Sequence, residues 1–305
     1  DAIADHNIWT SRFDSEIEDI FDLQDDVTRK VVSAVAPEYM TAEMRRSRQG
    51  AVPRLDAWEL AVRAHWHILQ FTKEDVSEAK SLLLKAVELD QNGSFGMADL
   101  SFTHLLESIN RWSDDPCASL KEAERVAQRA VSINSRDSYA LAFLGAVDLF
   151  SGRQMEAIGN LERAISLNSN DPHAYALLGR AQVYSGNSKD ARKNIEQAIR
   201  LSPRDPLIHL WHTTRSVCEF VDGLYEEAVE WARKAIRAQP NRGTTHMDIA
   251  VYCALSGRLD EARQAAAELA HFDIGSPFEL ADRTHPFTQQ EDREHYHRGL
   301  QAAGL

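Results

Sequence analysis

The side chains with which this chain could do chemistry include 12 histidines, three cysteines and 47 acidic residues. His65 and His67 are two residues apart, so on a helix they point to different faces and make a poor metal pair. His209 and His212 are three apart and could share a ligand, but no carboxylate or cysteine at helical spacing completes the set. We therefore predict no metal site, and we expect these histidines to face the core or a partner.

Sequence motifs of catalysis are absent as well. The sequence has no glycine-rich phosphate loop, no dinucleotide-binding fingerprint, no nucleophile elbow and no HExxH motif. Paired carboxylates such as Asp25-Asp26 and Asp114-Asp115 fall in predicted turns or on solvated faces. We predict that this chain is not an enzyme and that it binds no cofactor.

The net charge of −13 at pH 7 argues against binding to nucleic acid, which requires clustered Lys and Arg. The one basic cluster contains Arg45, Arg46, Arg48 and Arg54. We interpret it as a solvated linker, with a local anion patch as the alternative. No run of about 18 apolar residues occurs, so no membrane span is expected.

The three cysteines, Cys117, Cys218 and Cys253, are far apart and form no CxxC pair, so neither a disulfide framework nor a zinc site is indicated. Cys218 and Cys253 lie in apolar helical patterns and are predicted to be buried thiols. A reducing, cytoplasmic location fits this usage. The chain starts at Asp1 without a leader-like segment, which suggests a fragment or a processed product.

The elements that would position these side chains recur every 34 residues. The recurring positions are Asp137, Asp171 and Asp205, Gly145 and Gly179, and the segment RAVSIN at 129–134, which returns as RAISLN at 163–168. A fixed period with several independent matches indicates a repeat architecture.

Each unit is predicted to contain two helices. In DPHAYALLGRAQVYSG, Asp171 is a natural N-cap and Pro172 is tolerated in the first turn. Gly186 is predicted to end this helix in the left-handed conformation. The segment NSKDARKNIEQAIRLSPR then forms a second helix with one apolar face, which must be buried by stacking on its neighbours. Gly179, like Gly145, lies where we expect paired helices to approach too closely for a side chain.

This period, with glycines and alanines at fixed places, resembles the tetratricopeptide repeat family. The resemblance is clearest over residues 137–204 and extends with irregularities over 51–271. It implies an all-α fold, a right-handed superhelical solenoid of antiparallel helix pairs, with flanking helices before it and a capping helix after it.

The predicted segments are 1–14, the tail of a truncated upstream α/β domain or a linker; 15–50, flanking helices; 51–271, helical repeats; and 272–305, a linker and a C-terminal capping helix. In the last segment, Thr288 and Glu291 are predicted to form a capping box. Tyr296 and Leu300, one turn apart, are expected to seal the end of the solenoid.

The flanks support a narrower resemblance. The segments NIWTSRFDSEIEDIFDLQDDVTRKVVSAVAPEY, LDAWEL and HPFTQQEDREHYHRGLQAAGL resemble the carboxy-terminal half of bacterial signalling proteins. In these proteins an adenylate/guanylate cyclase domain or a winged-helix domain comes first, followed by a TolB-like domain and tetratricopeptide repeats. The resemblance implies that any catalytic domain lies upstream of this chain.

Tetratricopeptide arrays usually bind partners in the concave groove formed by the first helix of each pair. The positions that this resemblance assigns to the groove include Tyr139, Phe150, His173, Arg180, Tyr184 and Thr214. Members that clamp a terminal carboxylate present Lys and Asn, whereas this groove has alanines and Arg180 at those positions, so a carboxylate clamp is disfavoured. For the aliphatic groove positions, packing against neighbouring helices is at least as good an interpretation.

The sequence therefore predicts a non-catalytic protein–protein interaction or scaffold module, the regulatory half of a bacterial signalling protein, which binds a peptide or a partner helix in its groove. One alternative is a self-association module that makes the parent protein a homodimer. A further alternative is an accessory domain of an enzyme that senses a small ligand.

Overall fold

The computed structural model describes residues 55–272 and 275–305. Except for Leu55, these residues belong to one compact unit, Asp56–Leu305. The predicted upstream tail, the flanking helices of 15–50, the basic cluster at Arg45 to Arg54 and the first residues of the predicted repeat region lie outside the described residues. Within the described ranges all regular secondary structure is helical, which confirms the all-α prediction.

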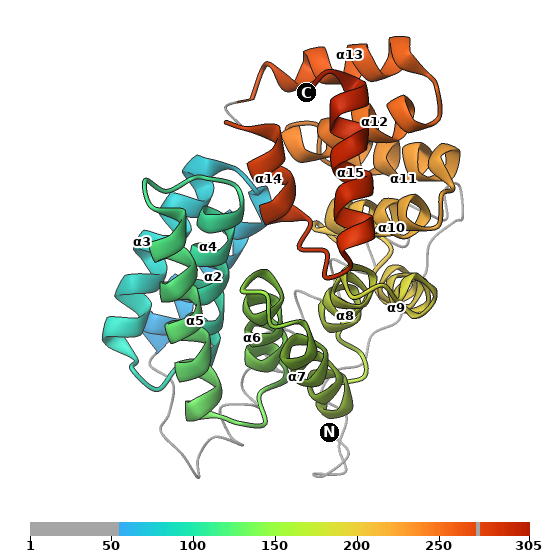
Figure 1. The fold of residues 1–305 in the computed structure, drawn as a ribbon. Helices are drawn as coiled ribbons and strands as arrows, with labels where there is room; N and C mark the ends of the chain where they lie inside the picture. The colour runs from blue at the N-terminus through green and yellow to red at the C-terminus, as the bar shows by residue number, and fades with distance from the viewer. Residues whose placement is uncertain (1–54, 273–274) are drawn as a thin grey trace, which may run out of the picture. The chain divides into compact units, whose positions relative to one another are not determined.

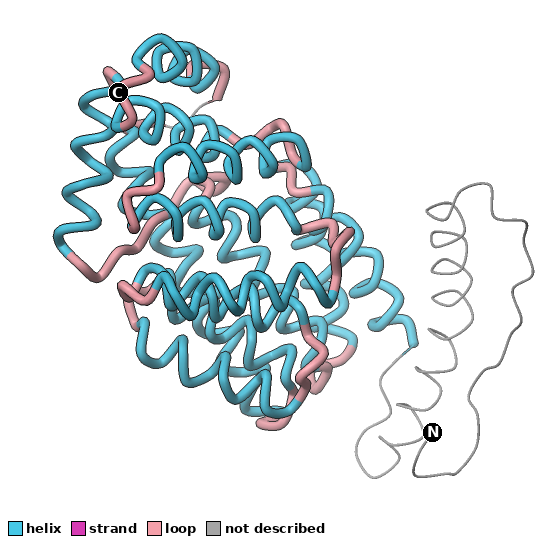
Figure 2. The backbone as a smooth tube through the Cα atoms, turned by 90° about the vertical axis from the view of Figure 1, so that its right-hand side faces the viewer, coloured by secondary structure: helices cyan, strands magenta, loops and turns pink. Residues whose placement is uncertain are grey.

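The described helices are arranged as six consecutive pairs followed by two further helices. The first three pairs are α2 (Leu55–Gln70) with α3 (Lys73–Leu89), α4 (Ser94–Ile109) with α5 (Pro116–Ile133), and α6 (Ser138–Phe150) with α7 (Gln154–Leu167). The next three are α8 (Pro172–Tyr184) with α9 (Ser188–Leu201), α10 (Ile208–Val221) with α11 (Tyr225–Ala238), and α12 (Gly243–Leu255) with α13 (Leu259–Leu269). They are followed by α14 (Pro277–Thr284) and α15 (Gln290–Ala303). Figures 1 and 2 show the stacked pairs, which confirm the predicted solenoid.

Two of the three repeated aspartates are N-caps, which confirms the prediction for Asp171; the third, Asp205, lies before α10, whose N-cap is Leu207. The side chain of Asp137 accepts hydrogen bonds from the backbone N–H groups of Tyr139 and Ala140 at the start of α6. Asp171 does the same at the start of α8, with Pro172 in the first turn. These caps satisfy N–H groups that have no partner within the helix. The sequence period thus corresponds to a period of helix starts.

Gly145 and Gly179 lie where the two helices of a pair touch. A Cβ on Gly179 would lie 2.9 Å from the backbone oxygen of Ala191 in α9. A Cβ on Gly145 would lie 2.7 Å from Cγ of Leu161 in α7. The close approach predicted for these two glycines is confirmed, and it brings the paired backbones nearer than any side chain at these positions would allow.

The core runs along the array between successive pairs. In α7, Ala157, Leu161 and Ala164 are buried along one stripe. Cys218 and Cys253 are both fully buried, which confirms the prediction for these thiols. Burial raises the pKa of Cys218 to about 12, so this thiol is not a nucleophile at neutral pH.

The C-terminal helix α15 packs along α12. The Tyr296 hydroxyl donates to Asp248 Oδ1 at 2.6 Å, and Tyr296 and Leu300 are buried. The predicted capping box is wrong: the N-cap of α15 is Gln289, which makes no side-chain cap. The N–H and the hydroxyl of Thr288 instead both donate to the backbone oxygen of Tyr184, at 2.9 Å and 3.1 Å. These hydrogen bonds attach the segment before α15 to the end of α8.

The first pair meets the connection between the fifth and sixth pairs. The Gln239 side chain, which follows α11, donates to the backbone oxygen of Gln70 at the end of α2, at 3.2 Å. Helix α14 contacts both α4 and α12, and Figure 1 shows it between them. The first two pairs of the array therefore lie against its C-terminal part.

Candidate interaction groove

An inner cavity lies among the first helices of successive pairs. Its volume is about 60 Å³, and its wall is mainly apolar, with contributions from α4, α6, α8 and α10. Four of the predicted groove residues line it, namely Phe150, His173, Arg180 and Thr214. Thr284 of α14 also lines the cavity, so the C-terminal segment forms part of its wall.

Arg180 is buried, with 9% of its surface exposed. Its guanidinium lies 4.8 Å from the centre of the Phe150 ring, a cation–π distance. Its Nη2 donates to the backbone oxygen of Thr284 at 3.4 Å, and the Tyr184 hydroxyl donates to the same oxygen at 3.1 Å. The chain's own C-terminal segment thus accepts hydrogen bonds from two of the side chains on α8, Arg180 and Tyr184.

His173 and Thr214 lie across the cavity from this contact. His173 is half-buried; its Nε2 lies 3.5 Å from Asp205 Oδ2, and its ring packs edge-on against Trp211. Thr214 is buried, and its hydroxyl donates to the backbone oxygen of Leu210 within α10. His173 therefore lines the groove with its Nε2 near Asp205, and the Thr214 hydroxyl is already satisfied within α10.

Tyr139 belongs to a different cluster. Its hydroxyl donates to Asp99 Oδ1 at 2.5 Å, and Asp99 Oδ2 lies 3.0 Å from Nδ1 of His65. Burial raises the pKa of Tyr139 well above its ordinary value. This cluster joins α2, α4 and α6. Tyr139 is not among the cavity-lining residues, although its ring centre lies 4.7 Å from that of Phe143, which lines the cavity.

The cavity is too small for a helix. A volume of about 60 Å³ holds a few water molecules or a small apolar group. Tyr184 is buried beneath the C-terminal segment, 1% exposed. A partner that enters this groove without displacing α14 can therefore place only a small side chain inside.

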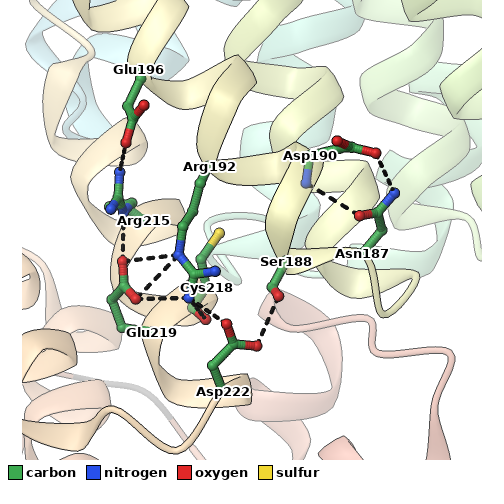
Figure 3. A network of polar contacts seen from close by, with 9 residues as sticks. All are labelled: Asn187, Ser188, Asp190, Arg192, Glu196, Arg215, Cys218, Glu219 and Asp222. Carbon is green, nitrogen blue, oxygen red and sulfur yellow. Dashed lines mark hydrogen bonds and ion pairs between the residues drawn. The ribbon is translucent and has the colours of Figure 1, made fainter.

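A cluster of ion pairs joins α9 to α10 (Figure 3). Arg192 donates to Glu219 at 2.8 Å and to Asp222 at 2.5 Å, and Arg215 donates to Glu219 at 2.6 Å. Burial tends to raise the pKa of Glu219, but the hydrogen bonds from Arg192 and Arg215 outweigh it and hold that pKa below its ordinary value. Because each of these side chains has an oppositely charged partner, we interpret the cluster as a structural link between two repeats.

The sequence analysis did not predict two features of this region, helix α14 and the position of Arg242. Helix α14 has a recognisable start: Ser276 accepts from the N–H of Glu279, and Pro277 occupies the first turn. The position of Arg242 in the wall of the cavity had no sequence signal, because it depends on how far the array curls.

His209 and His212 do not share a ligand: the first packs on Phe71 and the second on Trp231. Among residues 55–272 and 275–305, no group of three or more His, Cys, Asp or Glu side chains is placed to hold a metal ion. No described helix is both long enough and apolar enough to cross a membrane.

Comparison with known proteins identifies the repeats. Residues 176–243 match a family model described as tetratricopeptide repeat. A Rhizobium meliloti (strain 1021) protein named "Putative adenylate cyclase 3" is 31% identical over 137 residues, which cover 45% of this chain and 23% of that protein. The match therefore spans less than a quarter of the relative's length.

Solved structures share the fold. Human IFIT1, in a dimer with m7Gppp-AAAA, matches with a TM-score of 0.62 and 14% identity over 89% of this chain and 65% of its own. A chain of the APC/C hetero-tetramer Cut9-Hcn1 matches with a TM-score of 0.56 and 13% identity, over 86% of this chain and 46% of its own. At these identities the likeness shows the helical-repeat fold alone.

Proposed function

The helical array of this chain is a tetratricopeptide repeat array, and we propose that it is a non-catalytic, cytoplasmic module that binds a protein or peptide partner. The further proposal is that it forms the regulatory C-terminal part of a bacterial signalling protein of the cyclase or transcription-regulator class. The observation that carries the first proposal is the repeat fold itself, matched by the family model and by the solved neighbours.

Support for a protein partner comes from the architecture. Cut9-Hcn1 is a hetero-tetramer, so in that assembly a chain of this fold is held with other chains. Here the inner cavity offers a mainly apolar wall with His173 among its lining residues. Interface hot spots are pockets of this kind, in which one buried anchor supplies much of the binding energy. We propose that an extended peptide inserts one small apolar side chain between α6, α8 and α10.

Filling the cavity tests this binding mode. Ala176 lies on the cavity wall and is 5% exposed. Ala176→Leu should block an inserted side chain and weaken a peptide selected against the full chain at least about tenfold, as measured by fluorescence anisotropy. Ala267→Leu, on the exposed face of α13, is the matched control and should bind like the wild type. Equal affinity of a folded Ala176→Leu variant would contradict the proposed mode.

The regulatory role is supported by the relative named as an adenylate cyclase. The test measures the intact mass and the cyclase activity of the native polypeptide that contains this sequence, with and without residues 56–305. We expect a cyclase or winged-helix domain before the array, and an activity or DNA affinity that changes when the array is removed. A native polypeptide without such a domain would leave the array as an independent adaptor.

Self-association is the second candidate because of one exposed feature. Val62 and Trp66, one turn apart on α2, are 39% and 57% exposed. If a second copy of this chain covers this face, light scattering should show a mass that falls on dilution, and Trp66→Gln should shift the species to the monomer. A constant monomer mass would exclude this candidate.

A further inference from the structure

A second cavity lies where the first two pairs of the array meet its C-terminal part. It has a volume of about 210 Å³ and lies among the ends of α2 and α4, the start of α12, and α14. Its wall contains the cations Lys73, Arg111 and Arg242 and the aromatic side chains Phe71, Trp112 and Phe272. Among the described residues of its wall there is no Asp or Glu, although the chain carries a net charge of −13. An excess of cations in this one place favours an anionic ligand.

Arg242 is the side chain that most needs a partner. It is 8% exposed, and its Nε and Nη1 have no hydrogen-bond partner among the residues that the structure describes. Its Nη2 donates only to Thr244 Oγ1, at 3.1 Å, and its guanidinium lies 4.9 Å from the centre of the Phe71 ring. A buried guanidinium normally has a carboxylate partner, as Arg192 has in Glu219. Among the described residues no carboxylate forms an ion pair with Arg242.

The start of α12 adds donors to the same wall. Arg242 is the N-cap of α12 and supplies no side-chain acceptor to the first turn. Gly243 and Thr244, the first two residues of the helix, line the cavity. Helix N-termini carry partial positive charge and free N–H groups, and they bind oxyanions where a ligand can reach them. Here the helix terminus and the unpaired guanidinium face the same space.

The backbone on the opposite side is strained. Phe71 and Arg111 have φ angles of 55° and 56°, and within the described ranges they are the non-glycine residues with positive φ. Both line this cavity. Such conformations are unfavourable for residues with a side chain and persist where the surrounding structure holds them, which is often at a binding site. Arg111 lies 3.7 Å from Glu279 and is therefore partly neutralised, which leaves Arg242 as the main charge.

We propose that this cavity binds a small organic oxyanion, a carboxylate or a phosphate ester with an apolar or ring-shaped body. The oxyanion accepts hydrogen bonds from Nε and Nη1 of Arg242 and from the N–H groups that open α12. The body of the ligand packs against Phe71, Trp112 and Phe272, and Lys73 attracts the charge at the mouth. This site adjoins the proposed peptide groove, because Phe71, Asn110 and Arg242 line both cavities, but the proposal does not depend on peptide binding.

The test compares three probes on the full chain by titration calorimetry: benzoate, phenyl phosphate and inorganic phosphate. We expect saturable binding of at least one organic probe, tighter than that of inorganic phosphate. Preference for benzoate identifies a carboxylate site and preference for phenyl phosphate a phosphate site. Arg242→Gln should weaken the preferred probe at least about tenfold, whereas Arg263→Gln, at an exposed residue of α13, should not.

A stability measurement separates a ligand site from a structural role. Without ligand the buried, unpaired charge of Arg242 opposes folding, so Arg242→Gln should raise the melting temperature while it weakens binding. If Arg242 were structural, the substitution would lower the melting temperature. Should that variant fail to fold, the exposed Lys73→Gln variant must show weaker binding and a smaller salt dependence. Absence of saturable binding, or binding unchanged by the folded variants, would overturn the proposal.

Discussion

The glycines of this chain differ in what a methyl group on them would meet. A Cβ on Gly179 would meet a backbone oxygen of the paired helix, whereas a Cβ on Gly159, on the outer helix α7, would meet nothing within 4 Å. The same residue type is therefore required at one site and unfavourable at the other, since glycine in a helix costs about 1 kcal/mol relative to alanine.

Gly179→Ala should lower the free energy of unfolding by about 1–3 kcal/mol, because the added methyl group overpacks the contact with Ala191. Gly159→Ala is the matched control and should raise it by about 0.5–1 kcal/mol. Urea unfolding followed by circular dichroism measures both values. If the two variants shift stability in the same direction, the close approach of the paired helices does not explain Gly179.

At the scale of elements, α15 is attached to the array through buried polar groups as well as apolar packing. Asp248 of α12 is fully buried; its Oδ1 accepts from the Tyr296 hydroxyl at 2.6 Å and lies 3.0 Å from His285 Nε2. A buried carboxylate that loses a donor keeps its desolvation cost, so this bond specifies how α15 sits on α12.

Tyr296→Phe should therefore destabilise the chain by about 1–3 kcal/mol. Tyr225→Phe removes a half-buried hydroxyl that lies 2.9 Å from His295 Nε2, and it should cost less because water can replace that contact. Hydrogen exchange of α15 amides, measured with the unfolding curves, should show faster opening of α15 in Tyr296→Phe. Equal effects of both variants would argue against a special role of Asp248.

At the scale of the whole molecule, closure of the array brings together groups that are far apart in sequence. His209 of α10 packs on Phe71, which follows α2, and both lie near Arg242. Burial, followed by the charge of Arg242, lowers the pKa of His209 to about 3. Burial also lowers the pKa of His212 to about 4, with help from Lys234. Both histidines are therefore neutral in the folded chain at moderately acidic pH.

This arrangement predicts acid sensitivity. The unfolded chain binds protons on these histidines below about pH 6.5 while the folded chain does not, so the free energy of unfolding falls as pH falls from about 6.5 toward 4. The slope is at most about 1.4 kcal/mol per pH unit for each histidine. His209→Phe should flatten the pH dependence, measured by urea unfolding at several pH values. His271→Gln, at an exposed position, should not, and an unchanged slope in His209→Phe would contradict the assignment.

The sequence by itself determined the features that depend on near neighbours. The 34-residue period, the caps at Asp137 and Asp171, and the glycines at helix contacts all reflect interactions within one repeat or between adjacent ones. Such contacts produce a periodic sequence pattern because every repeat needs a cap at its helix start and a small residue at its helix contact. The predicted groove positions followed from the family resemblance, and their role as a partner site stays a prediction.

Only the tertiary structure decided what closes the array and what lies inside it. The contact between Gln70 and Gln239 joins residues 169 apart in sequence. Whether these two segments meet depends on the small rotation between each helix pair and the next, added over the whole array. The sequence of a single repeat does not indicate that total rotation. For the same reason the unpaired Arg242, the cationic cavity and the placement of Thr284 against Arg180 left no mark in the sequence.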